Sequence, residues 1–229
     1  MTTSEHRVRI RRVVHPDVPG PIGPRPTPRE RLAYSIRIRR IEYLPVELAG
    51  CAVAALLSVR SGSEPWSATA GVVAVLAALC CMHVVSMANA LAGRDIDASP
   101  LSDAVYELGP RAVRRQIGAT GVVLAGLAGC LAAGTGHWDI LALVAVTLYL
   151  GTRYATGPLR LRGAGGWQIP ALFLIRFWLP MVLIVRAQPG EPDWTVLLAI
   201  AGFAGCQVGI MLVGIARNRK PARGAGAAG

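Results

Sequence analysis

Residues 68–92 read ATAGVVAVLAALCCMHVVSMANALA and carry no formally charged side chain. A helix of this length spans the roughly 30 Å hydrocarbon core of a bilayer, because each residue adds about 1.5 Å to a helix. The chain holds further apolar runs, and Arg-rich segments separate them. A lipid solvent favours this block pattern, whereas one globular core does not require it. The sequence therefore predicts an all-α, polytopic membrane helix bundle.

About six transmembrane helices are expected along the chain. They are placed at residues 43–59, 68–92, 117–136, 140–155, 167–185 and 195–216, the fourth being the weakest. Residues 1–30 are basic and rich in Pro and Gly, so we expect a disordered arm before a bundle at 31–217, and a disordered tail at 218–229. The segment Arg29 to Glu42 interleaves Arg with Leu, Tyr and Ile, which suits a short helix on an anionic membrane surface.

The basic residues predict the orientation. The arm, the loops at 94–116 and 153–166 and the tail together hold 21 of the 24 Lys and Arg residues, all but Arg60, Arg176 and Arg186. Cytoplasmic loops concentrate such residues, so we expect a multi-pass protein of the cell membrane with both termini cytoplasmic and an even number of spans. The same pattern accounts for the net charge of +11 without nucleic acid as a partner.

Some residues inside the spans predict contacts between helices. Small residues recur every four positions from Gly121 to Ala133, and Gly205 and Gly209 form a GxxxG, spacings that let helices approach closely. A basic residue in mid-span costs roughly 2.5–3.5 kcal/mol, so Arg176 needs a partner, and Glu47 is the candidate.

Three polar residues of the second span share a helix face. His83, Ser86 and Asn89 follow one another at steps of three. They line a polar cavity or make hydrogen bonds that pack the helices together, and the sequence leaves both readings open.

Two segments next to predicted cytoplasmic loops carry the strongest motifs. The second span ends in MANALAGRDID at 87–97, and the fourth ends in YATGPLRLRG at 154–163, followed by Gly166 and Trp167. Together they resemble the UbiA superfamily of membrane prenyltransferases, which has an NDxxDRxxD-like motif after its second helix and a Tyr-Ser-x-Pro-Pro-Leu-Arg/Lys-Leu-Lys stretch after its fourth. The resemblance covers roughly residues 35–216.

The resemblance implies prenyl transfer from an isoprenyl diphosphate to an acceptor at the cytoplasmic membrane face. Mg²⁺ bridged by carboxylates would neutralise the diphosphate, and Arg residues would hold the remaining phosphate oxygens. The implied site residues fall into three groups. They are Asp97 and Tyr154 for catalysis, Asn89, Arg94, Arg160, Arg162 and Arg217 for substrate binding, and Asp95 and Asp97 for the metal.

The sequence departs from the family pattern at its acids. Ala90 and Gly93 stand at the first two Asp positions, Asp97 matches the last, and the stretch after the sixth span, GIARNRKP, has no acid. The family usually has nine helices, so the last three are expected to be missing. An alternative is therefore an inactive homologue that serves as a membrane partner or lipid-binding subunit, in a homo- or hetero-oligomer. A third class, an unrelated transporter, is disfavoured because the spans contain few polar residues and no visible repeat.

Overall fold

The computed structural model describes residues 26–61, 67–94, 100–155 and 168–218, and this part of the chain is helical and contains no strand. The elements are α2 (Pro28–Ile38), η1 (Ile41–Tyr43), α3 (Leu44–Ser61), α4 (Ala68–Gly93), α5 (Pro100–Leu108), α6 (Pro110–Thr135), α7 (Asp139–Ala155), α8 (Gln168–Leu172), η3 (Phe173–Trp178), α9 (Leu179–Arg186) and α10 (Trp194–Asn218). The all-α polytopic bundle expected from the sequence is confirmed.

Five helical stretches are long and apolar enough to cross a membrane. They are Ile41–Val59, Ala68–Gly93, Pro110–Thr135, Gln168–Arg186 and Trp194–Val213. The chain is thus a multi-pass membrane protein. The fourth expected span corresponds to α7, which is 17 residues long and so at the lower bound of spanning length.

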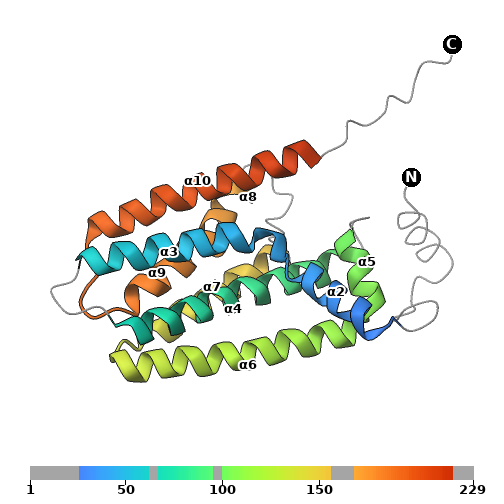
Figure 1. Ribbon diagram of the computed structural model, residues 1–229, viewed down its shortest axis with the longest axis horizontal. Coiled ribbons are helices and arrows are strands. Elements are labelled where there is room, and N and C mark those ends of the chain that lie inside the picture. The colour runs from blue at the N-terminus through green and yellow to red at the C-terminus, as the bar shows by residue number, and fades with distance from the viewer. Residues whose placement is uncertain (1–25, 62–66, 95–99, 156–167, 219–229) are drawn as a thin grey trace, which may run out of the picture.

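The long helices lie side by side along one axis (Figure 1). α2 packs across one end of the bundle, which we call the α2 end. α3 and α6 begin at this end, and α4, α7 and α10 finish there. Because α3 starts and α10 finishes at the same end, the chain between them crosses the bundle an even number of times. α7 is therefore a sixth element that runs between the two ends of the bundle, beside the five candidate spans.

α2 begins and ends at defined local signals. Thr27 and Glu30 form a reciprocal capping box, and Pro28 occupies the first helical position, where its missing N–H costs nothing. The helix thus starts slightly before residue 31, the expected boundary of the bundle. At the other end, Arg40 has a φ of 57°, the left-handed conformation, and turns the chain into η1 and α3.

The sequence predicts a loop at residues 94–116, and the structure forms the helix α5 within it. Its amphipathic sequence PLSDAVYEL buries Ala104 and Val105 against Ile38 of α2 and Met87 of α4. α6 also begins at Pro110, well before the expected start near Ile117. The first turns of α6 carry exposed arginines. Because the expected spans were placed where charged residues are few, these polar turns were not included in the expected helix.

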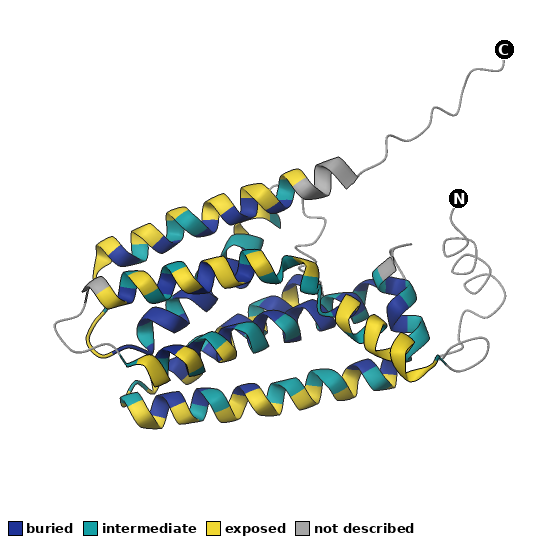
Figure 2. Cartoon of the chain, in the orientation of Figure 1, coloured by how far each residue is buried: buried dark blue, intermediate teal, exposed yellow. Residues whose placement is uncertain are grey.

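The core runs along α4, which other helices cover, whereas α6 and α10 show exposed residues along their outer faces (Figure 2). The expected role of the small-residue stripes within the bundle was wrong. A Cβ built on Gly121, Gly129, Gly205 or Gly209 would meet nothing within 4 Å. The close approaches occur instead at Gly50, against Gln207, and at Gly151, against Val85.

The fifth crossing element is irregular. Residues Phe173–Trp178 form a π-helical stretch between α8 and α9, with the Leu179 N–H donating to the Leu174 carbonyl five residues back. Pro180 provides a physical reason, because its ring clashes with the carbonyl four residues earlier, that of Arg176, and it has no N–H to donate. π-Helical turns are common at functional sites, and this one carries Arg176.

Candidate functional site

A charged pair lies buried between three crossing elements. The Arg176 Nη2 of η3 donates to Glu47 Oε1 of α3 at 2.5 Å, and Arg176 Nη1 donates to the Ser86 hydroxyl of α4 at 2.8 Å. Glu47 is 1% exposed and Arg176 is 7% exposed. The ion pair expected from the sequence is present, and it ties α3, α4 and η3 together.

Other polar groups extend this pair, and we call the whole set the polar cluster (Glu47, Arg176, Ser86, Tyr43 and Gln207). The Arg176 guanidinium lies over the Tyr43 ring, 5.3 Å from its centroid, and Arg40 lies 5.7 Å from the same ring. Gln207 of α10 donates to the Val46 carbonyl of α3. The sequence did not predict that Tyr43 and Gln207 would belong to this cluster. The amide of Gln207 could have been recognised as a candidate, because it stands alone in an otherwise apolar span.

Several buried atoms of the polar cluster have hydrogen-bonding capacity left over. Glu47 Oε2, Arg176 Nε and Gln207 Oε1 have no hydrogen-bond partner among the described residues. In a low-dielectric interior each such atom carries a desolvation cost. Intramembrane charges of this kind mark functional regions by default.

Tyr154 of the second motif packs against two of the elements that carry the polar cluster, α4 and η3. It is 5% exposed and packs with Val85, Ala171 and Ile175. Val85 directly precedes Ser86, and Ile175 directly precedes Arg176, so the motif tyrosine sits next to the elements that hold the ion pair. A Cβ on Gly151 would lie 2.3 Å from Val85 Cγ2, so the absence of a side chain at Gly151 brings α7 this close to α4.

Asn89 of the first motif lies one helical turn beyond Val85 on α4, toward the α2 end. Positions four apart share a helix face, so Asn89 follows the Val85–Tyr154 contact along α4. Its Oδ1 is buried and has no hydrogen-bond partner among the described residues. Arg94, half-buried, follows at the end of α4.

His83 belongs to a separate contact at the same end. Its Nδ1 lies 3.3 Å from the Arg39 carbonyl, so it joins α4 to the segment after α2. For His83 the structure supports the packing reading. Ser86 belongs to the polar cluster instead.

The remaining predicted site residues fall outside the described part of the chain. These are Asp95, Asp97, Arg160 and Arg162, together with the side chain of Arg217. Their proximity to the polar cluster stays a prediction. Within the described residues, no group of three or more His, Cys, Asp or Glu side chains could hold a metal ion.

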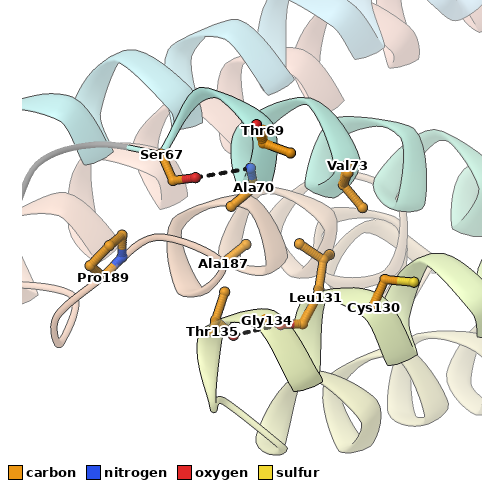
Figure 3. Close-up of a pocket in the computed structure, with 10 residues that line it drawn as sticks. All are labelled: Ser67, Thr69, Ala70, Val73, Cys130, Leu131, Gly134, Thr135, Ala187 and Pro189. Atoms are coloured by element: carbon orange, nitrogen blue, oxygen red, sulfur yellow. Dashed lines mark hydrogen bonds between the residues drawn. The ribbon is translucent and has the colours of Figure 1, made fainter.

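A pocket of about 420 Å³ lies at the opposite end of the bundle (Figure 3). The start of α4, the end of α6 and the turn after α9 form its walls. Its lining is mainly apolar, including Val73, Leu131 and Pro189, and none of the predicted site residues lines it. This pocket is therefore separate from the described motif residues Asn89, Arg94 and Tyr154.

The described motif residues Asn89, Arg94 and Tyr154 and the polar cluster together define the candidate site at the α2 end. Comparison of the chain with known family models, with curated proteins and with solved structures finds no match. The site is therefore interpreted from its own geometry and from the motifs.

Proposed function

We propose that this chain binds an isoprenyl diphosphate at the α2 end and transfers its prenyl group to an acceptor, as a UbiA-like membrane prenyltransferase. The observation that carries the proposal is the placement of the two motif helices. Tyr154 of α7 packs against Val85 of α4, one turn before Asn89, although the two motifs are far apart in the chain. Two sequence motifs that serve one site must lie on neighbouring helices, and the contact between α4 and α7 meets this condition.

The charge distribution supports a diphosphate at this end. Arginines of the described chain gather there, on α2 and the segment after it, at the end of α4 and on the first turns of α6: Arg29, Arg31, Arg37, Arg39, Arg40, Arg94, Arg111, Arg114 and Arg115. Arg160 and Arg162 follow Tyr154 in the sequence. Arginine suits phosphate oxygens because its planar fork donates two parallel hydrogen bonds. The same arginines favour a cytoplasmic position for the α2 end in the cell membrane.

The proposed chemistry uses apolar and polar parts of the same end. The prenyl chain would lie among the apolar helices, and the diphosphate would meet arginine donors at the membrane surface. Mg²⁺ would neutralise the leaving diphosphate, with Asp95 and Asp97 as its protein ligands, since such sites use one or two carboxylates plus substrate phosphates. The unpartnered Oδ1 of Asn89 would accept a hydrogen bond from a Mg²⁺-bound water.

The test is binding and turnover of radiolabelled farnesyl and geranylgeranyl diphosphate by the full chain in nanodiscs, with and without Mg²⁺. We expect Arg160→Gln/Arg162→Gln to weaken binding at least tenfold, because charge-assisted hydrogen bonds are lost. The matched control is Arg153→Gln, which removes an exposed charge at the same end and should leave binding unchanged.

The outcomes separate the two functional classes. Mg²⁺-dependent release of diphosphate that Asp97→Asn abolishes would support the enzyme. Binding without transfer to any aromatic or lipid acceptor would favour the inactive membrane partner, the second candidate, which the missing motif acids suggest. No saturable binding of either diphosphate would overturn both versions of the site.

A further inference from the structure

The outward face of α2 has no protein partner in the described chain. Tyr34 and Ile38 turn inward and pack with α4 and α5. Leu32 and Ile36, one turn apart, are 62% and 42% exposed. Arg29 is exposed on the same side of the helix, and Arg37 is exposed about a quarter turn away from Ile36. α2 therefore has one face buried against the bundle and another that combines two large apolar side chains with arginines.

The short connection between α2 and α3 determines how deep the outward face of α2 lies in the membrane. Only Arg39, Arg40 and the short η1 separate α2 from the apolar residues of α3. The candidate span begins at Ile41, so α2 lies where hydrocarbon gives way to headgroups. At that depth, Leu32 and Ile36 can enter the acyl boundary while the arginines stay among headgroups.

The first turns of α6 add charge to the same region. Arg111, Arg114 and Arg115 are exposed there. Next to them, Gln116 accepts from Arg39 Nη1 at 2.8 Å and donates to the Ser35 hydroxyl at 3.0 Å. α2 and the start of α6 are thus hydrogen-bonded to each other. The one acid on α2, Glu30, is hydrogen-bonded to Thr27 in the capping box.

We propose that the outward face of α2 and the first turns of α6, together the α2–α6 surface, bind the headgroups of anionic phospholipids. The charge identifies the occupant, because arginines surround the two apolar side chains and a zwitterionic headgroup would not neutralise them. This inference does not depend on prenyl transfer.

The hydrogen bonds between the α2–α6 surface and the rest of the bundle link lipid binding to the stability of the bundle. Gln116 links Arg39 and Ser35 of the α2 region to α6, and the Arg39 carbonyl meets His83 of α4. Anionic lipid that holds α2 in place therefore also stabilises the packing of α4 and α6 at this end. The lipid stabilises the whole bundle through the Ser35–Arg39–Gln116 network.

The experiment titrates the detergent-purified full chain with short-chain phosphatidylglycerol, phosphatidylcholine or inorganic phosphate, without a prenyl substrate. Native mass spectrometry reports binding, and thermal unfolding reports stabilisation. We expect tighter binding of phosphatidylglycerol than of phosphatidylcholine, and about a fivefold loss for each arginine removed in Arg29→Gln, Arg37→Gln and Arg114→Gln. Arg153→Gln is the matched control and should bind as the parent chain does.

Two further variants test the mechanism. Leu32→Ser/Ile36→Ser should weaken phosphatidylglycerol binding while leaving the fold intact, since both side chains are exposed. Gln116→Ala should still bind the lipid but gain less thermal stability from it. Equal binding of both lipids, or inorganic phosphate competing as well as phosphatidylglycerol, would overturn the proposal. So would an effect of Leu32→Ser/Ile36→Ser on self-association alone, which would assign the face to a second copy.

Discussion

Replacing Glu47 by Ala is expected to destabilise the bundle by about 3–5 kcal/mol, because Arg176 would keep its charge in an apolar interior without a counter-ion. Arg176 is 7% exposed, and within the described residues its other side-chain acceptor is the Ser86 hydroxyl. The measurement is the free energy of unfolding in mixed micelles with increasing SDS.

Two variants control for this prediction. Glu47→Leu/Arg176→Met removes both charges at once, so its loss should be much smaller than that of Glu47→Ala, and it can even stabilise. Arg186→Gln removes ion pairs with Asp139 and Glu191, whose carboxylates are exposed, and this should cost only about 1 kcal/mol. If Glu47→Ala costs no more than Arg186→Gln, the buried pair does not hold α3, α4 and η3 together.

Replacing Gly151 by Ala is expected to destabilise the bundle by about 1–3 kcal/mol, because the new methyl group overpacks a tight contact. It would lie 2.3 Å from Val85 Cγ2 and 3.2 Å from Ile175 Cγ2, and both neighbours are β-branched side chains with restricted rotamers. α7 would have to move away from α4, and Tyr154 would move with it. The same unfolding measurement applies, with binding of the diphosphate as a second readout.

The matched control is Gly126→Ala on the outer face of α6. A Cβ there meets nothing within 4 Å, so alanine should be neutral or should stabilise the helix by up to about 1 kcal/mol. A Gly151→Ala protein as stable as Gly126→Ala would show that α7 does not depend on this close approach.

Part of the candidate site could be predicted from single residues. Arg176 and Glu47 were identifiable because a charge inside an apolar span demands a partner, and these are the intramembrane acid and base that can meet. The contact of Tyr154 with Val85 could not be predicted in this way. It depends on which faces of α4 and α7 meet. Gly151 allows the close approach because it has no side chain, but the sequence does not show that Val85 is the residue opposite it.

The glycine stripes illustrate the same limit. Their four-residue spacing correctly marks faces where a helix could approach closely, but spacing does not reveal which face has a neighbour. In this structure Gly129 and Gly209 face outward, and Gly50 packs against Gln207 instead. α5 escaped detection because its nine residues are amphipathic and too short to register as a span.

The sequence by itself determined the all-α membrane bundle, its crossing segments and its basic end. These properties follow from how much apolar surface each segment carries. Each segment enters lipid or stays in water according to its own composition, so no contact with other segments is needed to predict them. The tertiary structure decided the π-helical position of Arg176, the contact of Tyr154 with α4, and the network from α2 to α6. Each of these depends on side chains far apart in the chain that meet only when the helices pack.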